Sequence, residues 1–438
     1  MKEKLLLGVG RKKITPKIGA CLYGYRPGLV STAVNDDLTS TAFYFKQGNA
    51  SALLVSVTVG SVREDITEDI FSRACKKHGI PTYAAIMNSI HTHSAPNVTG
   101  TYGWGDVDRE YCDEIFIPET LAAIDEAVKN ARPARMAIAS GESLIGVNRR
   151  QTSPCGKIDF GQDPAGVFDP QMTILSFCDD EERPIANIIH YGAHATAAGK
   201  NTEISRDWPG VMIDMLEEHT GAVTAFINGP EGDVGPRLSN GETTGGGDIG
   251  YAIRHGEWAG RDAIRIYDTA EGYHVPRLFA YEGKLDIPLM PRISLEEARR
   301  EHEKFKDFTV NSKGQLEKYY RDVIDSYGRG YTDVSCRTIN QSIIILGDLA
   351  IVAFPFELFS EIGLNVKKES RFAHVLSLSN SNGSMGYLST EREIIRGGYE
   401  ITMARTSSIQ AYAPDADRHI TIGTLKNLKS AEDTLCTE

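Results

Sequence analysis

The stretch from Thr82 to Gly100 constrains the fold most strongly, because an apolar segment changes there abruptly into a loop with two histidines. It reads TYAAIMNSIHTHSAPNVTG, and its strand-like residues end at Ile90, just before His91 and His93. Such a run indicates a buried strand followed by a polar loop. In open α/β sheets, ligands bind in the crevice outside the carboxyl ends of the strands. The stretch therefore predicts an α/β protein whose active site lies in loops at strand ends.

The same unit, an apolar strand followed by a loop with a reactive side chain, recurs along the chain. The side chains that follow predicted strands in this way are His91, His194, Asp233, Glu357 and Tyr387. Segments with helical spacing alternate with the strands, among them Val62–His78, Arg109–Asn130 and Tyr251–Thr269. The pattern predicts a mixed multi-stranded sheet core flanked by helices.

The chain has 438 residues and no linker rich in proline or serine, so we expect one domain over residues 1–438. Between residues 275 and 335 the sequence is charged and helical, with few candidate site residues. We interpret this segment as a helical subdomain that covers the catalytic domain. Chains of this size often form homo-oligomers, and the sequence leaves that question open.

Net charge, apolar runs and cysteine spacing limit the classes of partner and the cellular compartment that we expect. The formal net charge is −12 without a basic stripe, which argues against a nucleic-acid partner. No apolar run approaches the ~18 residues that a membrane helix needs, and the apolar run near the N-terminus is too short for a signal peptide. The seven cysteines stand singly, without a C-x-x-C pair, which favours a reduced, cytoplasmic protein.

Two imidazoles and one carboxylate that leave a coordination position open are the common ligands of a catalytic zinc. His91, His194 and Glu357 would supply this set, but the sequence has no H-E-x-x-H motif, so the fold would have to bring them together. The alternative is that these residues have structural roles only, because buried histidines with satisfied hydrogen bonds and helix-capping glutamates are abundant. Spacing alone leaves both interpretations open.

A set of motifs resembles the neutral/alkaline non-lysosomal ceramidase family. The resemblance covers nearly the whole chain in the family's order, although the chain ends near the boundary of the catalytic domain, without the family's C-terminal immunoglobulin-like domain. The motifs are GVGRKKITPKIGA near the N-terminus, IHTHSAP from Ile90, GVNRR from Gly146, H-A-T-A-A-G from His194, SRDWPG from Ser205, NGPEGDVGP from Asn228, FPFE from Phe354 and the segment from Gly386 to Glu400.

The resemblance implies a mixed α/β domain with one zinc ion per chain, which hydrolyses the amide bond of an N-acylsphingosine. By motif, it implies four zinc ligands: His91, His194, Glu357 and Tyr387. It implies that zinc-activated water attacks the carbonyl carbon, and the candidate catalytic residues are His93, Arg149, Tyr399 and Asp233. In this scheme His93 passes a proton to the leaving amine and Tyr399 stabilises the oxyanion.

Each of these roles has a structural alternative. Tyr387 and Tyr399 would then be aromatic walls of a pocket, Arg149 would pair with a nearby carboxylate, and His93 would only hydrogen-bond a neighbour of a metal ligand.

Position 235 departs from the resemblance, because glycine stands where the family has a serine linked to catalysis. We therefore expect amide hydrolysis of a small-molecule or lipid-like substrate that is smaller and more polar than ceramide. One alternative is metal-dependent hydrolysis of an ester, a lactone or a glycosidic bond in carbohydrate metabolism. Another is a catalytically inactive relative that binds a ligand, which would not need to retain the metal.

Overall fold

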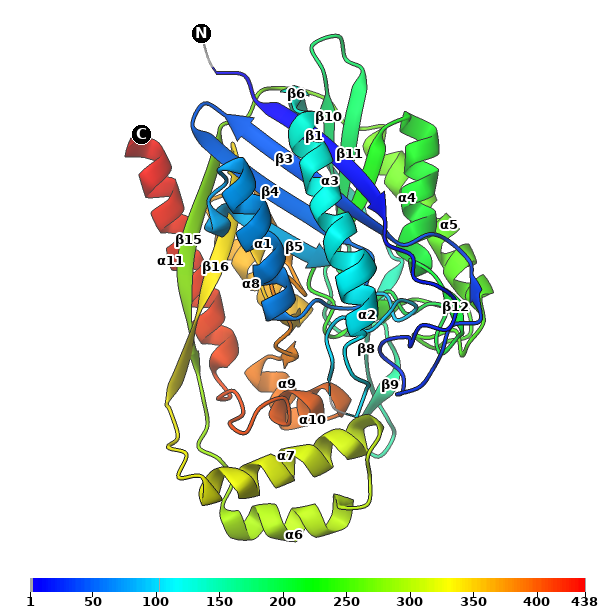
Figure 1. The fold of residues 1–438 in the computed structure, drawn as a ribbon, viewed down its shortest axis with the longest axis vertical. Coiled ribbons are helices and arrows are strands. Elements are labelled where there is room, and N and C mark those ends of the chain that lie inside the picture. The colour runs from blue at the N-terminus through cyan, green and yellow to red at the C-terminus, as the bar shows by residue number, and fades with distance from the viewer. Residues whose placement is uncertain (1–2, 102, 438) are drawn as a thin grey trace.

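Three sheets of four or five strands form the centre of the structure, a computed structural model that describes residues 3–101 and 103–437 (Figure 1). The first sheet has the strand order β5 (Ala85–Ser89), β4 (Ala50–Val57), β3 (Thr39–Gln47), β1 (Leu6–Lys13) and β6 (Arg132–Pro133). The second has the order β13 (Val223–Asn228), β11 (Pro184–Tyr191), β10 (Gln171–Cys178) and β7 (Arg135–Glu142). The third has the order β15 (Leu278–Pro288), β16 (Cys336–Leu346), β17 (Leu349–Ala353) and β19 (His374–Leu378).

Each sheet is an antiparallel arrangement extended by one parallel strand at its edge. The parallel pairs are β4 with β5, β11 with β13, and β17 with β19. Parallel strands end at the same edge of a sheet, and their carboxyl ends are where ligands bind in α/β folds. The predicted fold class, a mixed α/β core with its site at strand ends, is confirmed.

The sheets pack against each other in the middle, and helices cover their outer faces (Figure 1). Phe45 of the first sheet meets Phe177 of the second with 5.9 Å between ring centroids. The first sheet is covered by α1 (Glu64–His78) and α3 (Ile117–Lys129), and the second by α4 (Asp207–Thr220) and α5 (Ile249–Tyr267). The third is covered by α8 (Ser360–Glu369) and α11 (Ala416–Thr437). The apolar side chains are thus buried in three clusters, one of them shared by all three sheets.

Short elements build the end of the molecule that carries the strand-end loops. Three small sheets pair β2 (Ala33–Val34) with β12 (Glu203–Ile204), β8 (Gly146–Thr152) with β9 (Ile158–Asp163) and β14 (Val234–Pro236), and β18 (Glu357–Leu358) with β20 (Tyr387–Leu388). The short helices there are α9 (Glu391–Arg396) and α10 (Tyr399–Arg405), whereas η1 (Thr82–Ala84) precedes β5 at its amino end.

The helix expected over Arg109–Asn130 is interrupted. It starts as α2 (Arg109–Tyr111), where the Asp108 carboxylate accepts a hydrogen bond from the Tyr111 N–H, and continues through a π-helical turn, η2 (Cys112–Phe116), into α3. A π-helical turn adds one residue to the helical repeat, so a single 3.6-residue period cannot describe the whole segment.

Two helices, α6 (Leu295–Phe305) and α7 (Asn311–Gly328), connect β15 to β16 and lie at the bottom of Figure 1, below α10. The Trp104 indole N–H donates to the Gln315 side-chain oxygen at 3.0 Å and so ties α7 to the main body. The division into a catalytic domain with a covering subdomain at 275–335 stays a prediction.

Two further expectations concern the surface and the thiols. No helix of the described residues is long and apolar enough to span a membrane. The six cysteine side chains within the described part form no disulfide, and the side chain of the seventh, Cys436, lies outside it.

The close packing of α3 on β1 gives a test of the fold. A Cβ atom on Gly10 would lie 2.1 Å from the Ala123 carbonyl oxygen, so Gly10→Ala must push α3 away from the sheet. We expect the free energy of unfolding in urea to fall by about 1–3 kcal/mol. Gly328→Ala is the control, because a Cβ there has nothing within 4 Å and alanine favours a helix. Equal stability of the Gly10 variant and the wild type would contradict the packing described.

Candidate metal centre

Four side chains from strand-end loops meet in one buried cluster: His91, His194, Glu231 and Glu357. They follow β5, β11, β13 and β17, each of which belongs to one of the parallel pairs. Their potential ligand atoms all lie within 4.8 Å of one another. The convergence expected for His91, His194 and Glu357 is therefore present in the structure.

Backbone carbonyls orient both histidines. The Nδ1 atom of His91 lies 2.7 Å from the Gly60 carbonyl oxygen, and the Nδ1 atom of His194 lies 2.8 Å from the Glu231 carbonyl oxygen. An N–H at Nδ1 that donates to a carbonyl leaves the Nε2 lone pair free for a metal. Both Nε2 atoms face the same Glu357 oxygen, at 3.4 Å from His91 and 3.2 Å from His194.

The backbone of His91 has φ = 65°, in the left-handed region that histidine rarely adopts. The side chain that follows this turn has its Nδ1 atom against the Gly60 carbonyl oxygen. The loop is held further by a bridge between Thr92 and Ala195, which joins the two histidine loops to each other.

Glu231 was not singled out as a ligand in the sequence, although it lies in the NGPEGDVGP motif. Its side chain is fully buried; Oε1 accepts a hydrogen bond from the Asn380 amide at 2.6 Å, and Oε2 has no hydrogen-bond partner. Burial and the nearby Glu357 raise the pKa of Glu231 to about 8. Its position just after β13, a strand parallel to β11, was the signal that could have identified it.

The electrostatics of the cluster follow from burial and mutual pairing. Burial opposes ionisation of Glu357, but His91 and His194 outweigh it and hold the pKa of that carboxyl well below its usual range. Burial and the positive charge of Arg149 lower the pKa of His194 to about 3, so its imidazole is neutral. Two imidazoles whose Nε2 atoms face one carboxylate, with a second carboxylate whose Oε2 has no hydrogen-bond partner, are donors that fit a divalent cation.

His93 lies beside the cluster and forms a second group with His91 and His194. Neither of its ring nitrogens has a hydrogen-bond partner, and burial together with His91 lowers its pKa. Tyr23 and Tyr25 contact it edge-on, with ring centroids 5.3 and 5.0 Å away. A Cβ on Gly24 would lie 2.3 Å from His93 Nδ1, so the N-terminal segment needs glycine there to close over the ring.

Tyr387, Arg149 and Tyr399 form a connected group next to Glu357. Tyr387 pairs with Glu357 in register between β20 and β18, and its hydroxyl accepts a hydrogen bond from Arg149 Nη2 at 3.0 Å. The Tyr399 ring meets the Tyr387 ring edge-on at 6.2 Å. The structure therefore brings these three residues to the cluster, while metal ligation by Tyr387 stays a prediction.

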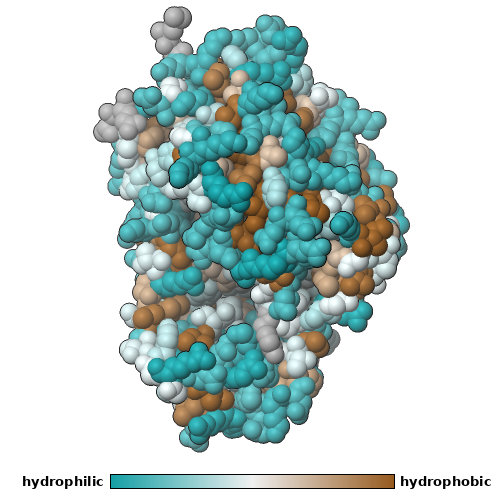
Figure 2. All heavy atoms as spheres, viewed as in Figure 1, coloured by the Kyte–Doolittle hydropathy of each residue, from teal (hydrophilic) through white to brown (hydrophobic). Residues whose placement is uncertain are grey.

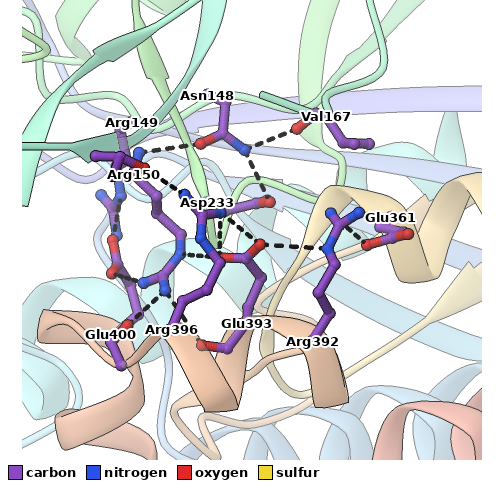
Figure 3. Close-up of polar contacts among 12 residues, drawn as sticks. Asn148, Arg149, Arg150, Val167, Asp233, Glu361, Arg392, Glu393, Arg396 and Glu400 are labelled. Carbon is purple, nitrogen blue, oxygen red and sulfur yellow. Dashed lines mark hydrogen bonds and ion pairs between the residues drawn. The ribbon is translucent and has the colours of Figure 1, made fainter. Parts of the chain in front are cut away.

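Asp233 lies apart from these side chains. Its carboxylate accepts hydrogen bonds from the Ser360 N–H at 2.7 Å and from the Asn148 amide at 3.2 Å, and its carbonyl accepts from the Arg149 N–H at 2.9 Å (Figure 3). Burial raises the pKa of Asp233 to about 7. These contacts connect β14 to β8 and to the start of α8; a catalytic role for Asp233 stays a prediction.

A cavity of about 410 Å³ opens onto the cluster. Its inner lining includes His91, His93, Glu357, Tyr387 and Tyr399. Charged side chains also line it, namely Arg63, Glu64, Lys318, Asp322 and Arg337. Hydrophilic residues cover much of the molecular face in Figure 2, which is indented between the main body and the α6–α7 pair.

Thr243 fills the space that a side chain at position 235 would use. Gly235 lies in β14, opposite Val147, and a Cβ there would lie 2.7 Å from the Thr243 Cβ. The glycine is thus part of the local packing.

The SRDWPG motif holds the His194 loop. The Asp207 carboxylate accepts hydrogen bonds from the N–H groups of Ala197 and Ala198, each at 2.9 Å. The Trp208 indole N–H donates to the His194 carbonyl oxygen at 2.9 Å. Asp207 itself has φ = 55°, so its backbone is strained where its side chain supports the loop.

A family model and a curated protein that match this chain are both described as neutral ceramidases. Residues 5–248 match the family model described as "Neutral/alkaline non-lysosomal ceramidase, N-terminal". The chain is 24% identical over 230 residues to a neutral ceramidase of Oryza sativa subsp. japonica, a match that covers 49% of this chain and 29% of that protein.

Two solved structures have a similar fold. One is the neutral ceramidase from Pseudomonas aeruginosa, with a TM-score of 0.77 and 18% identity over 99% of this chain and 75% of that one. The other is described as a ceramidase complexed with C2, with a TM-score of 0.74 and 17% identity over 99% of this chain and 76% of that one.

The support of the His194 loop can be tested through metal affinity. In Asp207→Asn, an NH₂ group replaces one acceptor and faces a backbone N–H, so the loop loses a hydrogen bond. We expect the affinity for a divalent cation, measured by competition with a chelator, to fall by about 10- to 100-fold.

Asp214→Asn is the matched control, because Asp214 lies on the same helix, half of its side chain is exposed, and it pairs with Arg206. Its affinity should stay within about threefold of the wild type. Equal losses in both variants would argue against a specific role for Asp207.

Proposed function

The chain belongs to the neutral/alkaline non-lysosomal ceramidase family, and from this we propose that it is a zinc-dependent hydrolase that cleaves the amide bond of an N-acyl substrate. One observation carries the proposal: the Nε2 atoms of His91 and His194 face one oxygen of Glu357 at the base of a cavity. Two imidazoles and a carboxylate with an accessible fourth side are the ligand set of many catalytic zinc sites.

A zinc ion held by His91, His194 and Glu357 would act as a Lewis acid and would lower the pKa of a bound water to about 7. His93 lines the cavity with both ring nitrogens unpartnered, so it is placed to carry a proton to the leaving amine. Arg149 and Tyr399 both contact Tyr387, the register partner of Glu357, and would supply positive charge and a hydroxyl donor for the negative charge that develops on the carbonyl oxygen.

The cavity lining supports a substrate that is smaller and more polar than ceramide. Arg63, Glu64 and Arg337 line it together with the ion pair of Lys318 and Asp322. In the described part of the chain, Arg337 has no ion-pair partner. Burial of long alkyl chains against these charged groups would cost their hydration, and a volume of about 410 Å³ suits a compact ligand.

Metal analysis combined with a substrate panel tests the proposal. We expect about one zinc per chain, lost in His194→Ala, and amide hydrolysis that falls at least about 10³-fold in the variant, because a metal contributes several kcal/mol to the transition state. The exposed His274 provides the control, and His274→Ala should keep both metal and activity.

The substrate panel should compare short-chain N-acyl amines with a long-chain N-acylsphingosine, an ester and a glycoside. Faster turnover of the long-chain lipid would contradict the substrate size, and cleavage of the ester or the glycoside alone would contradict the amide. Full zinc occupancy in a His91→Ala/His194→Ala double variant would refute the ligand assignment. A wild-type protein without metal or hydrolytic activity would instead be a ligand-binding relative.

A further inference from the structure

Glu400 joins two buried arginines, one of which hydrogen-bonds Tyr387 in the cavity lining. It lies in the first turn of α10, directly after Tyr399, and only 2% of it is exposed. Its Oε1 accepts a hydrogen bond from Arg149 Nε at 3.0 Å, and its Oε2 accepts one from Arg150 Nη1 at 2.5 Å (Figure 3). A buried carboxylate that is shared in this way holds both guanidinium groups in fixed planes.

We propose that Glu400 is a positioning residue of the active site, which fixes the Arg149 guanidinium so that it stays on the Tyr387 hydroxyl. The proposal rests on the proposed function for its catalytic consequence. Its structural part, the dependence of the Arg149 orientation on Glu400, stands independently of the reaction.

The geometry of Arg149 explains why one carboxylate decides its orientation. When Nε is bound to Glu400, the planar guanidinium directs Nη2 to Tyr387 Oη at 3.0 Å. The Phe160 and Tyr387 rings contact the same group, with centroids 5.1 and 5.7 Å from Cζ. Aromatic rings restrict the position of a guanidinium but do not fix its rotation, whereas a hydrogen bond to Nε does.

The pairing of Arg149 with Glu400 is also required by charge, in addition to geometry. Among the described residues, Glu400 is the carboxylate that forms an ion pair with Arg149, whose side chain is 6% exposed. A buried guanidinium that loses its partner must find water or another acceptor. Without the Glu400 charge, Arg149 would therefore move away from Tyr387 toward solvent or toward another carboxylate.

A second carboxylate, Glu393, provides a comparison within the same network. Glu393 Oε2 accepts from Arg150 Nε at 2.9 Å, and Arg150 Nη2 donates to the Gly397 carbonyl oxygen at 2.5 Å (Figure 3). Both glutamates thus bind Arg150 and attach the α9–α10 segment to β8. Glu400 differs from Glu393 in its other partners, because Glu400 contacts Arg149, whereas Glu393 also pairs with Arg396 and Arg392.

The test compares Glu400→Gln with Glu393→Gln in the full-length, zinc-loaded protein. Both variants remove one buried charge, and we expect similar decreases in melting temperature. For Glu400→Gln we expect kcat to fall about 10²-fold with KM changed less than about threefold, as for a misplaced catalytic group. For Glu393→Gln we expect kcat within about threefold of the wild type.

A double-mutant cycle with Arg149→Lys separates positioning from general damage. If Glu400 acts through Arg149, Glu400→Gln should lower kcat much less in the Arg149→Lys background than in the wild type. Additive losses, or equal losses of kcat in the Glu400 and Glu393 variants, would overturn the proposal.

Crystal structures of the two variants decide the structural part without activity. We expect the hydrogen bond from Arg149 Nη2 to Tyr387 Oη to be lost in Glu400→Gln and kept in Glu393→Gln. If this hydrogen bond persists in Glu400→Gln, the proposal is wrong, whether or not a substrate is turned over. Inactivity of the wild type would refute only the proposed function.

Glu400→Asp is the alternative if Glu400→Gln fails to fold. The shorter side chain keeps the negative charge but withdraws it from Arg149, so wild-type kcat in Glu400→Asp would also overturn the proposal.

Discussion

The site depends on the buried amide of Asn88, which connects strands from all three large sheets. Its Nδ2 donates to the carbonyl oxygens of Ser379 at 2.7 Å and Asn228 at 3.3 Å, and its Oδ1 accepts from the Asn228 N–H at 2.8 Å. Ser379 and Asn228 lie at the ends of β19 and β13, while Asn88 lies in β5. Because strands of separate sheets have no shared ladder to align them, these side-chain hydrogen bonds set where the loops carrying the candidate ligands begin.

Two kinds of buried charge lie on either side of Tyr387, and they are stabilised differently. On one side, imidazole and carboxylate atoms lie within 4.8 Å of one another, and this arrangement favours a bound cation. They belong to His91, His194, Glu231 and Glu357. On the other side, Arg149 and Arg150 pair with Glu400 and Glu393, so these buried guanidinium groups have their counter-charges without a ligand. Tyr387 connects the two through its hydrogen bond to Arg149. Arg149 therefore holds Tyr387, a residue of the cavity lining, while the ligand atoms that a cation would need lie where the histidines face Glu357.

Their positions after apolar strands made His91, His194 and Glu357 candidate ligands, although spacing alone left a metal site and satisfied core residues both open. The fold class followed from the same repeated unit. Glu231 and Asp233 show the limit of this reasoning. Both lie in one short loop, and only the direction of each side chain decides that Glu231 faces the cluster while Asp233 faces Ser360. The role of Glu400 could not be predicted either, because its partners are about 250 residues away and its contacts depend on how α10 docks on β8. The resemblance to a known family supplied His93, Arg149, Tyr387 and Tyr399, which spacing alone does not distinguish from ordinary core residues.

The contact between Gly235 and Thr243 has a consequence for relatives of this chain. The two positions compete for one volume, since a Cβ at 235 would lie 2.7 Å from the Thr243 Cβ. A relative with serine at 235 must therefore have glycine at 243 or a displaced loop there, because even alanine would retain the clashing Cβ. The residue at 235 and the length and path of the glycine-rich loop are thus expected to vary together in evolution. A member of the family that exchanges one without the other would carry a packing defect beside β14.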